Sequence, residues 1–124
     1  MVANGDGPRD HPAIKHLNLP PLGNPGRAAP LLTKTLLFIG EGSSAMSTNG
    51  PRLPPGMPPT ISPGAGGNGF TALDKATGAT LWRMQLPAGT TGAPITYAYQ
   101  GKQYIVVAVG DDRHLPEWIA LGLP

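Results

Sequence analysis

The side chains that could carry out acid–base or metal chemistry lie in two short segments. Asp111, Asp112 and His114 follow a predicted strand end, where they could form a metal or acid–base cluster. Aspartate is common in turns because its carboxylate bonds nearby backbone N–H groups, so we assign these residues to a turn. His11 and His16 are five residues apart in a proline-containing segment, and the pattern supplies no third ligand. We therefore predict no catalytic or metal-binding residue in this chain.

A glycine-rich run, Gly64–Gly69, matches the G-x-G-x-x-G pattern of dinucleotide-binding loops. That loop needs a strand before it and a helix after it, so that the helix N-terminus faces a pyrophosphate. Here Pro58, Pro59 and Pro63 precede the run, and a predicted strand follows it. We interpret the run as a flexible linker.

The composition indicates a small, loop-rich domain. Of 124 residues, 18 are Gly and 16 are Pro, and only 13% are charged. The absence of Cys excludes disulfides, zinc fingers, iron–sulfur sites and thiol nucleophiles. The nine Lys and Arg residues are scattered without interleaved aromatic residues, so we expect no nucleic-acid binding despite the net charge of +2. We also expect no signal peptide and no transmembrane segment, because no apolar run approaches about 20 residues.

The proline and glycine content falls near residue 70, and this change divides the chain. We predict an irregular N-terminal arm over residues 1–30, and β-structure with long Pro/Gly-rich loops over residues 31–124. The expected elements are a strand or short hairpin over 31–39, a loop over 41–69, a hairpin over 70–86 and closing strands over 94–123. Only Pro12–Leu19 could accommodate a helical turn. The predicted fold class is all-β.

Two of the expected strands indicate how the sheets are covered. In one, Ile95, Tyr97 and Tyr99 share a face, which is the period of two of a half-buried strand. The other, Ile105–Val109, is apolar on both faces. We expect such a strand to be covered on both sides, inside a stack of sheets.

The most informative pattern is Ala72-x-Asp74-x-x-Thr77-Gly78-x-x-x-Trp82. It predicts a hairpin whose tight turn is held by local hydrogen bonds of Asp74 and Thr77, while Gly78 supplies an unusual backbone angle. Ala72 is small enough to let another sheet approach. Trp82 presents a large apolar ring that we expect to be wedged between adjoining sheets, with its indole N–H seeking an acceptor. From the spacing alone, an isolated hairpin in a β-sandwich is an alternative.

This pattern resembles the tryptophan-docking repeat of the eight-bladed β-propellers of quinoprotein dehydrogenases, which use pyrroloquinoline quinone (PQQ). Further runs are similar to the carboxyl-terminal region of sugar- and alcohol-oxidising members: Leu17–Gly23, Pro30–Gly42, Leu86–Tyr97, Gly101–Ala108 and Leu115–Pro124. The resemblance covers roughly residues 11–124. It implies that the chain forms the last blade or blades of such a propeller. One departure is Gln100-Gly101, where the family usually has Asn-Gly or Asp-Gly.

For a complete family member, the resemblance implies hydride transfer from a sugar or alcohol to PQQ, with Ca²⁺ as Lewis acid and a carboxylate as base. It also implies electron transfer to ubiquinone or a cytochrome, in the periplasm or at the periplasmic face of the inner membrane. The family's catalytic aspartate and calcium ligands match no position here, so we expect an inactive fragment. Its expected partners are the missing N-terminal blades or another copy. Exposed sheet faces and edges should make the chain alone marginal, oligomeric or aggregation-prone.

Two other interpretations fit part of the pattern. A noncatalytic propeller-repeat scaffold, of the kind found among outer-membrane assembly lipoproteins, would carry the docking repeat but would not need the flanking runs. A small self-contained β-domain with a proline-rich arm would need no neighbouring blades. The doubly apolar strand Ile105–Val109 argues against this last alternative.

Overall fold

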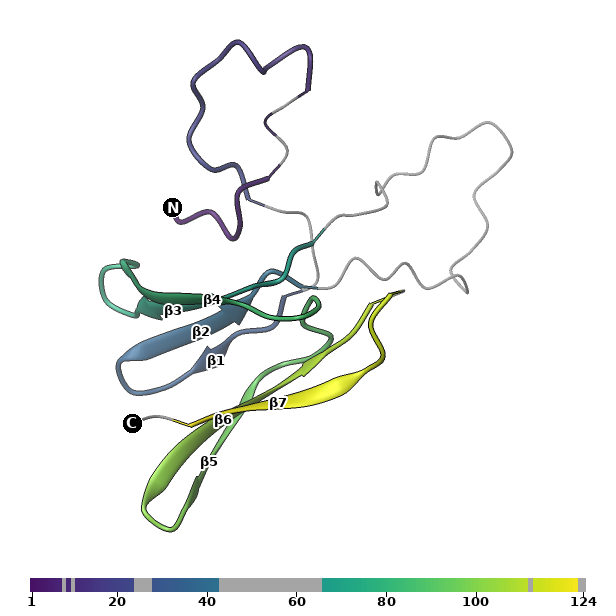
Figure 1. Cartoon of the computed structure of the whole chain (residues 1–124). Helices are drawn as coiled ribbons and strands as arrows, with labels where there is room; N and C mark the ends of the chain where they lie inside the picture. The colour runs from purple at the N-terminus through teal and green to yellow at the C-terminus, as the bar shows by residue number, and fades with distance from the viewer. Residues whose placement is uncertain (8, 10, 24–27, 43–65, 112, 123–124) are drawn as a thin grey trace, which may run out of the picture.

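The computed structural model describes residues 1–7, 9, 11–23, 28–42, 66–111 and 113–122. These described residues form seven strands and no helix, in two antiparallel sheets (Figure 1). The four-stranded sheet contains, in spatial order, β1 (Leu31–Leu32), β2 (Leu36–Gly40), β3 (Gly69–Asp74) and β4 (Thr80–Gln85). The three-stranded sheet contains β5 (Ile95–Tyr99), β6 (Lys102–Val109) and β7 (Glu117–Gly122). The all-β class predicted from the sequence is confirmed.

The segment predicted as a strand or short hairpin over 31–39 is a hairpin. The short strands β1 and β2 pair antiparallel, with Leu31 opposite Phe38. Thr33 closes the connection, because its hydroxyl donates to the Leu36 carbonyl and accepts from the Leu36 N–H, both at 3.0 Å. The hydroxyl thus holds the turn from both sides, which is a common use of threonine outside regular pairing.

The predicted hairpin over 70–86 is formed by β3 and β4. Phe70 pairs with Met84 and Ala72 pairs with Trp82, so these four side chains share one face. The register shifts after Ala72, where Leu73 pairs with Thr80. This irregularity adds a residue to β4 next to the tight turn, as β-bulges do where a strand bends.

The predicted closing strands over 94–123 are β5, β6 and β7. A two-residue turn joins β5 to β6, with φ of +49° at Gln100 and +77° at Gly101. Two consecutive positive φ angles match the right-handed twist of a hairpin and normally favour Asn-Gly. Gln100 therefore adopts an angle that Asn takes more easily, at the position where the sequence departs from the family that it resembles.

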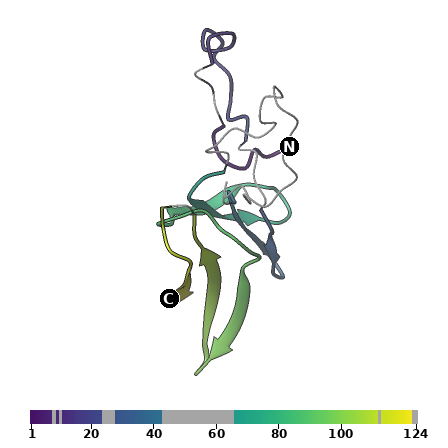
Figure 2. The same cartoon turned by 90° about the vertical axis from the view of Figure 1, so that its right-hand side faces the viewer.

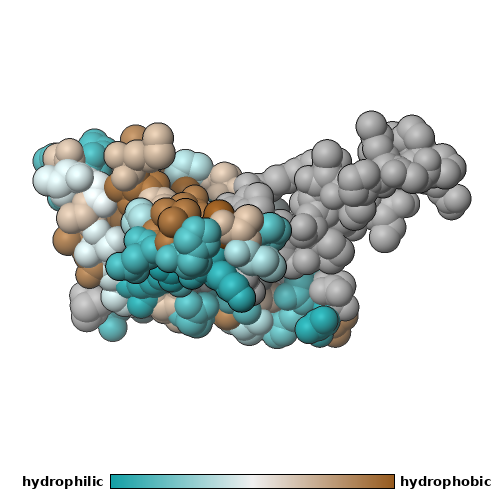
Figure 3. All heavy atoms as spheres, turned by 90° about the horizontal axis from the view of Figure 1, so that it is seen from above, coloured by the Kyte–Doolittle hydropathy of each residue, from teal (hydrophilic) through white to brown (hydrophobic). Residues whose placement is uncertain are grey.

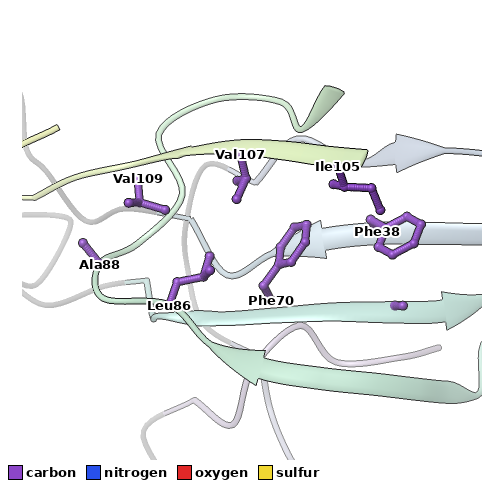
Figure 4. Close-up of a cluster of buried hydrophobic side chains, with 8 residues drawn as sticks. Phe38, Phe70, Leu86, Ala88, Ile105, Val107 and Val109 are labelled. Atoms are coloured by element: carbon purple, nitrogen blue, oxygen red, sulfur yellow. The ribbon is translucent and has the colours of Figure 1, made fainter. Parts of the chain in front are cut away.

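The core is one layer of apolar side chains between the two sheets. The four-stranded sheet contributes Phe38, Phe70 and Ala72, and β6 contributes Ile105, Val107 and Val109. Leu86 and Ala88, on the connection between the sheets, complete the cluster. Figure 4 shows the β6 side chains pointing toward the phenylalanines and Leu86. The Phe38 and Phe70 rings stack, with centroids 6.3 Å apart.

One close approach fixes the spacing of the sheets. Thr90 is buried and forms an isolated bridge with Val109, beside the three-stranded sheet. A Cβ atom on Gly40 of β2 would overlap the Thr90 side chain. Glycine is therefore required at position 40, because the backbone of β2 lies against the side chain of Thr90, which adjoins the three-stranded sheet.

Two predictions about burial are wrong for the described residues. Only one face of β6 is fully buried, since Ile105, Val107 and Val109 are buried while Val106 is half-buried. The face of β5 that carries Ile95, Tyr97 and Tyr99 is exposed rather than half-buried. The physical reason is the same in both cases. The four-stranded sheet covers one side of the three-stranded sheet, and no described segment covers the other.

The N-terminal arm forms a third layer. It lies on the opposite side of the four-stranded sheet from the core (Figures 1 and 2). Asn4 Nδ2 donates to the Gly40 carbonyl at 2.9 Å, and the Leu22 N–H donates to the Asp6 carbonyl at 3.0 Å. Seen from the arm side, a hydrophobic patch lies beside hydrophilic residues (Figure 3). The described parts of the predicted irregular arm contain turns at residues 12–16 but no strand or helix.

Most of the predicted loop over 41–69 lies outside the described residues. Its described ends contact one another, because the Gly67 N–H donates to the Gly42 carbonyl at 3.1 Å. Within the described part of the chain, no helical segment has the length and apolar character needed to cross a bilayer.

We expect Phe70→Ala to lower the free energy of unfolding by about 3–5 kcal/mol, because Phe70 is fully buried in the apolar layer that joins the two sheets. Urea unfolding followed by circular dichroism measures the change. Leu81→Ala is the control, since Leu81 lies on β4 and is 59% exposed. A loss below about 1 kcal/mol at Phe70 would mean that the sheets do not depend on this layer.

Candidate functional site

The Asp74 carboxylate organises the turn between β3 and β4. Its Oδ1 accepts hydrogen bonds from the N–H groups of Ala76 at 3.0 Å and Thr77 at 2.7 Å, and from the Thr77 hydroxyl at 2.8 Å. Thr77 Oγ1 in turn accepts from the Ala79 N–H at 3.2 Å. Gly78 has a φ of +75°, a left-handed angle that glycine adopts without strain. The local hydrogen bonds and the backbone angle predicted from the sequence are confirmed.

These hydrogen bonds lower the pKa of the Asp74 carboxyl. The Thr77 hydroxyl, followed by the Thr77 N–H, holds the pKa of Asp74 below its usual value of 3.8. Asp74 is therefore an anionic acceptor at neutral pH. The same turn is attached to the first hairpin, because the Lys75 N–H donates to the Thr35 carbonyl at 2.9 Å.

Trp82 is placed on the core side of the four-stranded sheet. Its ring meets Phe70 edge-on, with centroids 6.4 Å apart and an interplanar angle of 90°. The side chain is nevertheless 43% exposed, so the prediction that it is wedged between adjoining sheets is wrong for the described residues. The reason is that β4 is an edge strand. The fully buried positions of this sheet lie on β2 and β3, and none lies on β4.

An ion pair that the sequence reasoning missed joins β4 to the end of β2. Arg83 Nη2 lies 2.5 Å from Glu41 Oε1, and the Glu41 side chain is only 6% exposed. A Cβ atom on Gly69 would overlap this carboxylate, so glycine at 69 makes room for it. The alternation of side chains along the strands could have indicated this pair. Glu41 is two residues beyond Ile39, on the side of the sheet that also carries Arg83.

The outer face of the four-stranded sheet is the side opposite the core. The N-terminal arm covers it and leaves a cavity of about 1140 Å³. The sheet lines this cavity with Ile39, Thr71, Leu73, Thr80 and Arg83, and the arm lines it with residues 1–6 and 20–23. Most of these side chains are apolar or small, and the guanidinium is already paired with Glu41. The cavity therefore offers a packing surface rather than an acid–base centre.

Asp111 lies in a turn, as predicted. Its Oδ1 accepts from the N–H groups of Arg113 at 2.8 Å and His114 at 2.7 Å. The hydrogen bond from the Arg113 N–H contributes most to holding the pKa of Asp111 below its usual value of 3.8. His114 Nε2 lies 2.9 Å from Glu117 Oε1 at an exposed position. Asp112 lies outside the described residues.

The two N-terminal histidines are exposed on the arm. His11 Nδ1 accepts from the Ala13 N–H at 3.2 Å, within a turn. Among the described residues, no group of three His, Cys, Asp or Glu side chains is placed to hold a metal. The glycine run 64–69 lies partly outside the described residues, so its interpretation as a linker stays a prediction.

The described residues do not fit the cofactors that the resemblance implies. A calcium site needs about six to eight oxygen ligands with several carboxylates. The one carboxylate buried among the described residues is that of Glu41, and it is paired with Arg83. PQQ is a polyanion, whereas the described cavity presents a single arginine, already engaged in this pair. We therefore assign no step of PQQ or calcium chemistry to these residues.

Comparison with known proteins gives a consistent set of matches. The family model for "PQQ: Glucose/ethanol/alcohol dehydrogenase, beta-propeller domain" matches residues 1–105. A probable quinate dehydrogenase (quinone) of Xanthomonas campestris pv. juglandis is 48% identical over 48 residues, which are 37% of this chain and 6% of that protein. A quinoprotein glucose dehydrogenase of Gluconobacter oxydans is 45% identical over 58 residues, which are 43% of this chain and 7% of that protein.

A third relative is named as a methanol dehydrogenase. Methanol dehydrogenase [cytochrome c] subunit 1 of Paracoccus denitrificans is 38% identical over 52 residues, 42% of this chain and 8% of that protein. The matched part of the chain thus spans less than a tenth of the length of each of these curated relatives. No solved structure matches the chain significantly.

We expect Asp74→Asn to lower the melting temperature at pH 7 and the difference from the wild type to shrink in acid. The folded pKa of Asp74 lies below 3.8, so its stabilising contribution is present above that pH and is lost as pH falls through the folded value. Thermal melts between pH 7 and pH 2 measure the effect. Asp6→Asn removes an exposed carboxylate of the arm and is the control. An equal loss at every pH would contradict an electrostatic role of Asp74.

Proposed function

This chain belongs to the PQQ glucose/ethanol/alcohol dehydrogenase β-propeller family, and from this premise we propose that it builds the carboxyl-terminal part of a dehydrogenase propeller. The proposed reaction of the assembled enzyme is the oxidation of a sugar or an alcohol. When bound, PQQ supplies the quinone that accepts hydride from the CH–OH carbon. The proposed role of this chain is to pack against neighbouring blades and close the ring around that site.

The half-covered ring of Trp82 is the observation that carries the packing role. The turn held by Asp74 and Thr77 places Trp82 on the same face as Phe70 and Ala72. The indole packs perpendicular to the Phe70 ring, and 43% of the side chain is left for a further surface. Because large aromatic rings gain most from burial on both sides, this arrangement fits a docking residue at a boundary between blades.

The proposed substrate class rests on the names of the relatives. They are named for glucose, methanol and quinate, and each of these carries a CH–OH group or is a simple alcohol. We propose ubiquinone or a cytochrome as electron acceptor, since one relative is named for a quinone and another for cytochrome c. Calcium as Lewis acid, and the periplasm or the periplasmic face of the inner membrane as the location, belong to the same proposal. The partners would be the preceding blades or another copy.

We expect the purified chain alone to show no turnover. The assay adds PQQ and Ca²⁺ and follows dye reduction with glucose, ethanol or methanol. The described residues hold neither a calcium site nor an unpaired buried carboxylate to act as base, so the rate should equal that of buffer. Dye reduction above buffer that depends on both PQQ and substrate would contradict this expectation.

We expect the chain to restore activity to a related enzyme that lacks the matching segment. The Gluconobacter oxydans glucose dehydrogenase is truncated before the segment matched here and coexpressed with this chain. Glucose-dependent dye reduction should appear with the wild-type chain and fall at least tenfold with Trp82→Ala. The matched control is Leu81→Ala, which alters the adjacent exposed residue of β4. Equal recovery with both variants would argue against docking by Trp82.

A noncatalytic scaffold is the second candidate, and the apolar exposed face of β5 favours it because such a face suits protein binding. The two functions predict different results in the coexpression experiment. A scaffold would associate with the truncated enzyme or with other proteins without restoring dye reduction. Recovery of PQQ-dependent activity favours the dehydrogenase.

A further inference from the structure

We propose that Asn4 is a site of spontaneous deamidation, and that its conversion to aspartate or isoaspartate unties the N-terminal arm from the four-stranded sheet. The reacting segment is Asn4-Gly5-Asp6-Gly7, at the start of the arm. The proposal does not rest on the PQQ function, because it follows from the chemistry of an asparagine–glycine pair and from the contacts that Asn4 makes.

An asparagine followed by glycine can modify itself without an enzyme. The backbone nitrogen of Gly5 attacks Cγ of Asn4 and gives its proton to water or hydroxide, while the Cγ–Nδ2 bond breaks and ammonia leaves. Water then opens the five-membered succinimide at one of its two carbonyls, which gives aspartate or isoaspartate. The net change consumes one water and releases one ammonia. Glycine speeds the attack because it has no Cβ atom to block the approach of its nitrogen.

The structure leaves the attacking nitrogen of Gly5 without a competing partner. Asn4 and Gly5 lie in a bend outside the seven strands. Among the described residues, the Gly5 N–H donates no hydrogen bond, and its φ of +80° is an angle that residues with a side chain rarely adopt. The Asn4 side chain donates through Nδ2, the leaving group, to the Gly40 carbonyl. The nitrogen of Gly5 is therefore available for attack, and the group that leaves is the one that fastens the arm.

A second Asn-Gly pair is protected by its surroundings and gives an internal comparison. Asn68 precedes Gly69, the first residue of β3. The Asn68 carbonyl accepts from the Leu86 N–H at 2.8 Å, and the Gly69 carbonyl accepts from the Glu41 N–H at 3.0 Å, so the backbone is held on both sides of the pair. Gly69 is also buried. Closure of the succinimide ring there would break paired β-structure, so we expect Asn68 to deamidate slowly.

Deamidation removes the hydrogen bond that joins the start of the arm to β2. Asn4 Nδ2 donates to the Gly40 carbonyl at 2.9 Å. An ionised aspartate has only acceptor oxygens, so this bond is lost and a carboxylate faces a carbonyl oxygen. Isoaspartate also adds a carbon atom to the main chain, which shifts Asp6, whose carbonyl accepts from the Leu22 N–H at 3.0 Å. Both products therefore weaken the attachment of the arm.

Release of the arm changes the surface that the four-stranded sheet presents. The arm covers the outer face of this sheet, where Ile39 and Leu73 line the cavity beneath it. Without the arm these apolar side chains meet water. The reaction runs in one direction because the released ammonia is diluted into the solvent. Deamidation of Asn4 is therefore a one-way, time-dependent change in the packing of this chain.

The first test incubates the full chain at pH 8 and follows deamidation by tryptic digestion and mass spectrometry. Trypsin places the three Asn-Gly pairs, at Asn4, Asn49 and Asn68, in separate peptides that span residues 1–9, 35–52 and 53–75. Peptide 1–9 should gain the mass of deamidation at least tenfold faster than peptide 53–75. Asn49 lies outside the described residues and does not enter the comparison. Conversion of Asn4 no faster than that of Asn68 would overturn the proposal.

A variant of the neighbouring residue tests the mechanism of the reaction. Gly5→Ala keeps the Asn4 amide but places a Cβ atom beside the attacking nitrogen, so conversion of Asn4 should slow at least fivefold. Isomerisation at Asp6-Gly7 does not disturb the measurement, because it leaves the mass unchanged. Circular dichroism checks that the variant keeps its β-structure. An unchanged rate would rule out attack by the backbone nitrogen.

The second test measures whether the product unties the arm. Asn4→Asp supplies the aspartate product directly, and hydrogen–deuterium exchange of the Leu22 N–H should become at least fivefold faster than in the wild type. Asn18→Asp is the matched control, since it makes the same change at an exposed arm position whose side chain forms no hydrogen bond among the described residues. If Leu22 exchanges equally in both variants, Asn4 does not hold the arm, and the proposed untying is wrong.

Discussion

Both sheets depend on a single shared layer of apolar side chains. The largest fully buried side chains are those of Phe70, Ile105, Val107 and Val109, and all of them lie in this layer. A three-stranded or four-stranded sheet gains little stability from strand pairing alone and must bury one face against something. Here each sheet supplies the cover for the other. Loss of the layer would therefore expose both sheets at once, and their folding is coupled although their strands pair only within each sheet.

Two glycines allow close approaches on opposite faces of the four-stranded sheet. Gly40 lets Thr90 enter between the sheets, and Gly69 makes room for Glu41 next to the guanidinium of Arg83. The first keeps the sheets close, and the second places the buried carboxylate against its counter-ion. A side chain at Gly40 would have to displace the Thr90 side chain, and one at Gly69 would have to displace the Glu41 carboxylate from its position beside Arg83. The exposed turn at Asp74 is different, since its hydrogen bonds are local and do not require the second sheet.

Local patterns predicted local structure well. The hydrogen-bonding residues and glycine of the Ala72–Trp82 pattern gave the turn, and the alternation around Tyr97 gave a strand. The surroundings of those side chains were not predictable. The alternation of apolar and polar residues along a strand shows that its two faces differ, but it does not show which segment covers each face. The doubly apolar strand Ile105–Val109 suggested two covers, and the described residues supply one. The Glu41–Arg83 pair joins positions 42 residues apart, which no local pattern encodes.

The carboxylates and the exposed apolar side chains of the described residues indicate different roles. Catalytic carboxylates work because their environment leaves them without full compensation, so that they can take or give a proton. Asp74 and Asp111 each accept two local N–H hydrogen bonds through Oδ1 at exposed turns, and Glu41 is paired with an arginine. Among the described residues, the large uncovered side-chain surfaces are apolar instead: part of the Trp82 indole and the exposed rings of β5 and β7. Apolar surfaces of this kind suit packing against a further apolar surface, which agrees with the packing role that we propose for this segment.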